Sequence, residues 1–182
     1  MSPAAARFAV FLRGMNLGGR RITNPDLCAA VEALGFGGVC AFQAAGNLVV
    51  EAKAREAVAV RNRLEKGLAA ALGYAVPAFV RDATALRAIA ERRPFPPAVL
   101  ARSGGKPQVA FLREAPADEA RAAVIALATD DDRLVWAESE LHWLPERGVG
   151  SSELEWKRIE RLVGPTTVRT QGTIERLQAK HF

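Results

Sequence analysis

A glycine- and arginine-rich segment at residues 13–21 carries the residue types best suited to binding an anion. It combines three glycines, the amide of Asn16 and three arginines. Accessible backbone N–H groups and planar guanidinium groups are common partners of phosphate and carboxylate oxygens. The segment therefore predicts a site for a small anionic or phosphate-bearing ligand, with a nucleotide among the candidates. The residues expected to bind this ligand are Arg13, Gly14, Asn16, Gly18, Gly19, Arg20, Gln43 and Asn47.

The same segment also has a purely structural interpretation. It matches neither the Walker phosphate loop nor the dinucleotide-binding fingerprint. Glycines with positive φ are typical of a tight connection from a strand to a helix, and Asn16 could bond to its own backbone there. Asp26, near the start of the next helix, would repel an anion. Both interpretations of the segment stay open at this point.

The amides of Gln43 and Asn47 flank Gly46 in a predicted hairpin turn. Such amides orient ligands well, and they would meet Arg13 if the sheet brings both segments to one end. Asn at a hairpin turn is also favoured by the backbone alone, and this structural role is the preferred interpretation.

A second glycine-rich stretch at residues 147–152 offers N–H groups, two serine hydroxyls and Arg147 ahead of a predicted helix. This pattern is compatible with an anion site. Ser151 or Ser152 together with Glu155 equally resembles a helix cap, which is the favoured interpretation.

Cysteine and histidine side chains give no credible catalytic set. Cys28 and Cys40 lack metal-ligand spacing, and we expect both to be small buried residues in a helix and a strand. His142 is expected within a strand, and His181 in a frayed final segment. We therefore assign no reaction, metal or cofactor.

Three tryptophans and a run of aspartates have structural interpretations. Trp136, Trp143 and Trp156 could stack on bases, but the RNA-recognition motif is missing, so core or interdomain packing is favoured. The aspartates at 130–132 lack the alternation of a calcium loop, and we expect a solvated turn.

Composition limits the class of protein and its partners. The 182 residues are 49% apolar, with 25 Lys and Arg against 20 Asp and Glu, a net charge of +5. This excess is modest and disfavours a dedicated nucleic-acid surface without excluding one. No apolar run reaches the ~18 residues of a membrane span, and no leader pattern is present. We expect a cytoplasmic protein, with homodimerisation through open sheet edges as an alternative to ligand binding.

The order of predicted elements indicates the fold. Residues 8–12 read as a buried strand, and Asn24-Pro25-Asp26 reads as the capped start of a helix that Gly35 ends. Strands at 39–43 and 48–51, a helix at 54–72 and a strand at 76–81 complete a β-α-β-β-α-β unit, which is the ferredoxin-like order.

The order then starts again after a helix at 83–92 and a proline- and glycine-rich stretch. Its expected elements are strands or helices at 108–113, 117–128, 133–137, 141–144, 152–163, 166–170 and 172–180. The predicted class is α+β, with two ferredoxin-like halves in tandem, antiparallel or mixed sheets and a C-terminal helix. The predicted boundaries are an N-terminal half at 1–93, a linker at 94–107 and a C-terminal half at 108–182.

Three segments resemble one bacterial family, catalogued as domain of unknown function 1697. Residues 12–19 read LRGMNLGG, residues 42–49 read FQAAGNLV, and residues 76–81 read VPAFVR. The family's usual forms are L-R-G-[IM]-N-[VL]-G-G, Y-I-Q-S-G-N-V-V and V-P-V-[IV]-V-R. The resemblance covers nearly the whole chain, and it implies a cytoplasmic α+β protein of two related halves with no established activity.

The chain departs from the family pattern mostly in its second half, where the family often reads G-x-G-R-S-K-L and T-T-R-N-W-N-T-V. The departing positions are Ala45, Glu153, Thr170, Gln171 and Gly172. If these positions carry a family function, the resemblance implies that this chain has lost or altered it.

Overall fold

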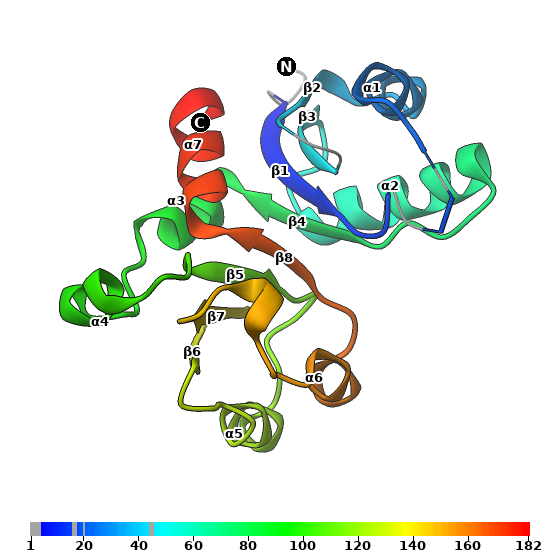
Figure 1. Cartoon of the computed structure of the whole chain (residues 1–182). Coiled ribbons are helices and arrows are strands. Elements are labelled where there is room, and N and C mark those ends of the chain that lie inside the picture. The colour runs from blue at the N-terminus through cyan, green and yellow to red at the C-terminus, as the bar shows by residue number, and fades with distance from the viewer. Residues whose placement is uncertain (1–4, 16–17, 20, 44–45) are drawn as a thin grey trace. The chain divides into compact units, whose positions relative to one another are not determined.

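Figure 1 shows the computed structural model, in which residues 5–15, 18–19, 21–43 and 46–182 are described. The chain divides into two compact units. The first comprises the residues up to Ile89 together with Leu177–Phe182, and the second comprises Ala90–Arg176.

The first unit contains a four-stranded antiparallel sheet in the order β2-β3-β1-β4. This arrangement is the ferredoxin-like topology predicted from the sequence. Its elements are β1 Ala6–Leu12, α1 Asn24–Ala33, β2 Gly37–Ala41, β3 Asn47–Ala52, α2 Ala57–Leu72 and β4 Ala78–Asp82.

The second unit repeats this topology with a sheet in the order β6-β7-β5-β8, again antiparallel throughout. The predicted fold class, two α+β halves of β-α-β-β-α-β order, is therefore confirmed. Its elements are β5 Gln108–Phe111, α5 Asp118–Ile125, β6 Asp132–Ala137, β7 Glu140–Pro145, a 3₁₀ turn η1 Val149–Ser151, α6 Trp156–Val163 and β8 Thr167–Thr170.

In the described ranges, three helices do not belong to either β-α-β-β-α-β repeat: α3 Ala83–Glu91, α4 Pro97–Arg102 and α7 Gln171–His181. Helix α4 falls within the stretch predicted as a linker, and Pro97 occupies its first turn. Proline is favoured there because its missing N–H has no partner in a helix start. The domain boundaries at 93 and 108 stay a prediction.

The end of α7 is held within the first unit. The Arg7 guanidinium donates from Nη1 to the carbonyl oxygen of His181 at 2.6 Å. The His181 ring meets the Phe42 ring edge-on, with centroids 5.8 Å apart. His181 is therefore part of a helix and packed, whereas the sequence predicted fraying.

The N-cap of helix α1 lies one residue before Asn24, which the sequence predicted as the cap. The N-cap is Thr23, whose Oγ1 accepts a hydrogen bond from the Asp26 N–H at 3.3 Å. Asn24 is instead inside the helix, and its Nδ2 donates to the carbonyl oxygen of Gln43 at 2.8 Å. Both residue types suit a cap, so the sequence alone does not separate them.

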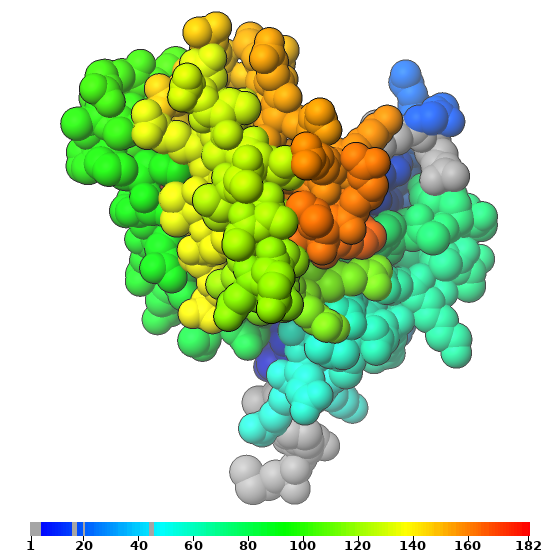
Figure 2. Space-filling model, turned by 90° about the horizontal axis from the view of Figure 1, so that it is seen from below, coloured from blue at the N-terminus to red at the C-terminus, as the bar shows by residue number. Residues whose placement is uncertain are grey.

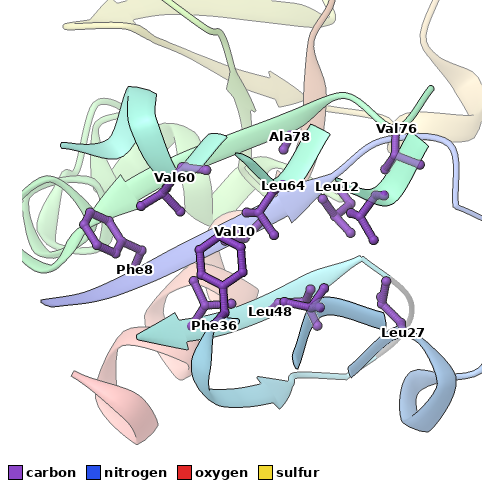
Figure 3. Packing of buried hydrophobic residues seen from close by; sticks show 14 of the residues in the cluster. Phe8, Val10, Leu12, Leu27, Phe36, Leu48, Val60, Leu64, Val76 and Ala78 are labelled. Carbon is purple, nitrogen blue, oxygen red and sulfur yellow. The ribbon is translucent and has the colours of Figure 1, made fainter. Parts of the chain in front are cut away.

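The core of the first unit lies between one face of its sheet and the helices α1 and α2 (Figure 3). Phe8, Val10 and Leu12 alternate along β1 and pack on this side. Ala9 and Phe11 point to the opposite face and are also fully buried. Burial on both faces explains why β1 is a continuous apolar run.

A matched pair of substitutions on α2 tests this packing. Val60 is 1% exposed in the core, whereas Val58 is 50% exposed on the same helix. We expect Val60→Ala to lower the free energy of unfolding by about 2 kcal/mol, since it leaves a cavity. Val58→Ala should change it by less than about 0.5 kcal/mol. Urea unfolding measures both, and equal effects would contradict this assignment of the core.

In the second unit, α5 and α6 pack side by side on one face of the sheet, as Figures 1 and 2 show in yellow-green and orange. Trp143 is buried in this core, and Trp136 and Trp156 pack against it. The three tryptophans therefore have the packing role that the sequence predicted.

Candidate functional site

The glycine-rich segment and the hairpin turn meet at one end of the first sheet. The Leu12 N–H donates to the carbonyl oxygen of Gly46 at 2.6 Å, and the Arg13 N–H donates to that of Pro77 at 3.0 Å. The antiparallel register places the end of β1 beside the start of β3 and of β4. The sheet thus places Arg13 and the hairpin turn at the same end, which is the condition under which the sequence predicted that they meet.

Gly14, Gly18 and Gly19 all have positive φ, at 73°, 63° and 82°. The backbone therefore requires glycine at each position, as the structural interpretation holds. A Cβ atom at any of the three would meet no atom of a described residue within 4 Å. Described protein atoms therefore leave open space beside these glycines, and a ligand could approach the backbone there.

A cavity of about 440 Å³ lies next to this segment, at the start of α1. Its lining includes Arg21, Ile22, Thr23 and Asp26. Arg21 is exposed and forms no hydrogen bond or ion pair with any described residue. Asp26 accepts a hydrogen bond from the Thr23 hydroxyl at 2.6 Å, and this neutral donor does not offset the negative charge that Asp26 brings to the cavity.

The polar residues of the hairpin turn are used partly by the turn itself. Asn47 is buried, and its Nδ2 donates to the carbonyl oxygen of Phe42 at 3.2 Å. Gln43 adopts a positive φ of 57°, and its carbonyl oxygen accepts the bond from Asn24. The structural role predicted for this asparagine is therefore present. Asn16, Arg20 and Ala45 lie outside the described residues.

The second glycine-rich stretch does not cap a helix as predicted. Helix α6 begins at Trp156, after Glu155, which makes no side-chain cap. Ser152 Oγ instead donates to Asp132 Oδ1 at 2.7 Å and accepts from the Leu154 N–H at 3.1 Å. Arg147 pairs with Asp131 at 3.1 Å.

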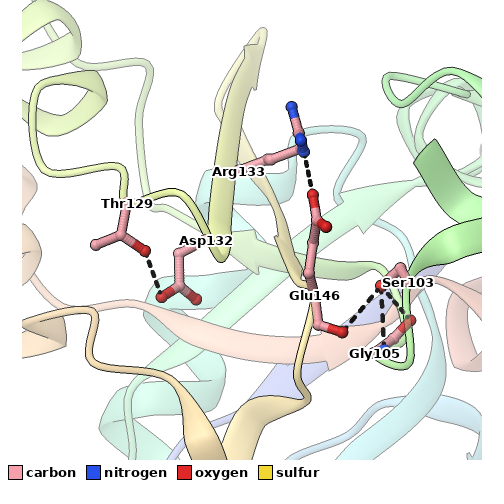
Figure 4. Close-up of polar contacts among 6 residues, drawn as sticks. All are labelled: Ser103, Gly105, Thr129, Asp132, Arg133 and Glu146. Carbon is pink, nitrogen blue, oxygen red and sulfur yellow. Dashed lines mark hydrogen bonds and ion pairs between the residues drawn. The ribbon is translucent and has the colours of Figure 1, made fainter.

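Asp132 is buried, which corrects the expectation of a solvated turn. It is 1% exposed and begins β6. Its carboxylate accepts hydrogen bonds from Trp143 Nε1 at 2.7 Å and from the Thr129 hydroxyl at 3.0 Å, the latter drawn in Figure 4. The sequence does not predict that Asp132 is a buried acceptor, because its donors Trp143 and Ser152 lie 11 and 20 residues away along the chain.

A cavity beside this carboxylate is not predicted by any pattern in the sequence. It measures about 440 Å³ and lies in the second unit. Apolar and aromatic walls with a few polar groups are typical of small-molecule sites. Its lining includes Gln108, Trp143, Ser152, Leu154, Trp156 and Val168.

The cysteines and histidines do not form a nucleophilic site in the described part of the chain. Burial raises the pKa of the Cys28 thiol, so it stays protonated, and Cys40 Sγ donates to the Ala41 carbonyl at 3.5 Å. Burial, with a smaller effect from Arg92, lowers the pKa of His142 to about 4. No group of three or more His, Cys, Asp or Glu among the described residues could hold a metal ion.

The family model of a protein of unknown function, DUF1697, matches residues 5–142 of the chain. The chain belongs to the DUF1697 family. Of the five positions at which the resemblance implies a departure from the family pattern, Ala45 lies within the matched range, and the other four lie beyond its end. A conserved bacterial protein from Streptococcus pneumoniae has a similar structure, with a TM-score of 0.72 at 19% identity, covering 97% of this chain and 98% of that one. No curated protein sequence matches the chain.

Two of the positions that the resemblance marks as departures have structural roles. Thr170 Oγ1 accepts a hydrogen bond from the Thr173 N–H at 3.2 Å at the start of α7. Gln171 Nε2 donates to the Ala90 carbonyl at 3.0 Å. Whether the departures alter a function of the family stays a prediction. None of the helices in the described ranges is long and apolar enough to cross a bilayer.

Proposed function

We propose that the segment at residues 13–21 binds a small phosphate-bearing ligand. The observation that carries this proposal is the guanidinium of Arg21, which has no partner among the described residues and lines a cavity beside open glycines. An unpaired guanidinium is a strong partner for a phosphate because it can donate two parallel hydrogen bonds. The proposed binding residues remain Arg13, Gly14, Asn16, Gly18, Gly19, Arg20, Gln43 and Asn47, to which the structure adds Arg21.

Asp26 narrows the class of ligand. Its carboxylate lies in the same cavity and opposes a bare anion placed against it. A sugar phosphate or nucleotide avoids this repulsion if its phosphate pairs with Arg21 and one of its hydroxyls donates to Asp26. We therefore propose a phosphate ester that carries hydroxyl groups, rather than inorganic phosphate.

The test is thermal unfolding and titration calorimetry with ribose 5-phosphate, AMP and inorganic phosphate. A ligand that binds only the folded chain raises the melting temperature by mass action. We expect a rise with at least one of the two esters and a smaller one with inorganic phosphate. Arg21→Ala should weaken ester binding at least about tenfold, because a charge-assisted hydrogen bond is lost.

Arg55→Ala is the matched control, since Arg55 is also exposed and unpaired among the described residues of the first unit. Its ester affinity should equal that of the wild type. Absence of binding by both esters, or equal losses in the two variants, would refute the proposed site. Homodimerisation and nucleic-acid binding stay predictions, checked by light scattering and by oligonucleotide titration at low salt.

The cytoplasmic location is likewise a proposal. Both cysteines are free thiols. Free thiols persist in a reducing compartment, which supports this location.

A further inference from the structure

We propose that the cavity of the second unit, lined by Trp143 and Trp156, binds a small organic cation of the alkylated ammonium type. This site is separate from the proposed phosphate site, and no residue is shared between them. Three features of the cavity support a cation: its aromatic walls, the buried carboxylate beneath it and one available hydrogen-bond acceptor.

The aromatic walls suit a cation. The rings of Trp143 and Trp156 have centroids 5.1 Å apart and planes inclined at 36°. Both indole N–H groups are used within the protein, by Asp132 Oδ1 at 2.7 Å and by Thr166 Oγ1 at 2.9 Å. The rings therefore offer a ligand their π surface and no donor, and this surface attracts cations.

The charge beneath the cavity lacks a positive partner. Asp132 is almost fully buried, and its carboxylate accepts from an indole and two hydroxyls, all neutral donors. No ion pair to it forms in the part of the chain that the structure describes. Buried charges are normally paired. Trp143 and Ser152 connect this carboxylate to the cavity that they line, so a bound cation would supply the compensating charge.

The available acceptor belongs to Gln108, which is 6% exposed and lines the cavity. Its Nε2 donates to the Lys106 carbonyl at 2.8 Å. Its Oε1 accepts no hydrogen bond from any described residue. A hydroxyl or N–H on the ligand would satisfy this oxygen. An anion would instead face an acceptor and a buried carboxylate, so the cavity selects against it.

The volume of the cavity and the charges at its border are consistent with a small free cation as the ligand. About 440 Å³ lies within the range of small-ligand cavities. Glu153 and Glu155, both exposed, lie on the segment between η1 and α6 that borders the cavity. Their charges favour the approach of a cation.

The experiment compares choline with 3,3-dimethylbutanol, which has the same shape and hydroxyl but a carbon in place of the charged nitrogen. Calorimetry on the wild-type protein should show choline binding at least about tenfold more tightly. Tryptophan fluorescence should change on choline binding, because two of the three tryptophans line the cavity. Equal affinities, or no binding of choline and tetramethylammonium, would overturn the proposal. So would binding of a trimethyllysine peptide without binding of the free cations.

A charge-removing variant isolates the carboxylate. Asp132→Asn keeps the side-chain shape and should reduce the preference for choline over 3,3-dimethylbutanol at least about fivefold. Asp130→Asn, an exposed neighbour, makes the same change in net charge and should leave the preference intact. If Asp132→Asn does not fold, Trp156→Phe serves as the second variant, with choline affinity expected to fall about threefold. Arg21→Ala should bind choline normally, which separates this site from the phosphate site.

Discussion

Gly105→Ala should destabilise the protein by about 3 kcal/mol or more, whereas Gly104→Ala beside it should have little effect. A Cβ atom at Gly105 would overlap the carbonyl oxygen of Pro145 and lie 2.8 Å from its carbonyl carbon. It would also lie 3.1 Å from the backbone nitrogen of Gly148. These are backbone atoms, so no side-chain rotation relieves the overlap.

The loop around Gly105 cannot shift without losing hydrogen bonds. The N–H groups of Gly104 and Gly105 donate to the carbonyl oxygen of Glu146 at 2.9 and 3.0 Å. The Ser103 hydroxyl bonds to the same loop, as Figure 4 shows, and Glu146 also pairs with Arg133. Displacing the loop would leave these groups unpaired, which adds to the steric cost.

Urea unfolding of the two variants separates the effect of the overlap from that of losing glycine. At Gly104 a Cβ atom would lie 3.6 Å from the nearest atom, the Glu146 carbonyl oxygen, an ordinary contact. Similar midpoints for Gly104→Ala and Gly105→Ala would show that the loop yields and that this close approach is not required.

Lowering the pH from 7 to 5 should destabilise the wild-type protein through His142. This histidine is 1% exposed, and its Nε2 has no hydrogen-bond partner among the residues that the structure describes. Burial and Arg92 lower its pKa from 6.5 to about 4 in the folded chain. Between pH 6.5 and about pH 4, the histidine of the unfolded chain binds a proton that the histidine of the folded chain does not. The free energy of unfolding therefore falls as the pH drops below about 6.5, and the full gap is worth about 3 kcal/mol.

His142→Leu removes the titrating group while keeping an apolar side chain of similar size between Val109 and Val135 on the neighbouring strands. We expect the wild-type protein to lose about 2 kcal/mol more than this variant between pH 6.5 and 5, where most carboxylates stay ionised. Denaturant unfolding at several pH values gives both slopes. Parallel slopes would mean that His142 is protonated in the folded chain as readily as in the unfolded one.

The order of elements could be predicted because each helix or strand has an apolar pattern that is contained within its own residues. The continuous apolar run of β1 and the stripe Val60, Leu64 and Leu68 on α2 are each read within a few residues. The doubled β-α-β-β-α-β order then follows from counting. Helix α4 is not predicted because three prolines indicate a break, although proline is also favoured at the start of a helix.

The sites were less predictable because their contacts join distant residues. The glycines at 14, 18 and 19 carry a local signal, and the open space beside them agrees with it. Asp132 carries no such signal, since its donors come from β7 and from the segment after η1. The predicted start of α6 is too early for the same reason, because Ser152 bonds to Asp132 and not to the helix. Arg21 lay in the predicted segment, but its lack of a partner is visible only in the fold.

The sharing of α7 between the two units has a consequence for protein synthesis. Residues 177–182 belong to the same compact unit as the residues up to Ile89, and Arg7 bonds to His181. A ribosome must therefore translate the whole of the second unit before the first one can receive its final helical turns. While the second unit is being translated, the N-terminal unit lacks residues 177–182, and the surface that they cover stays exposed. The order in which the units emerge is thus not the order in which they can be finished.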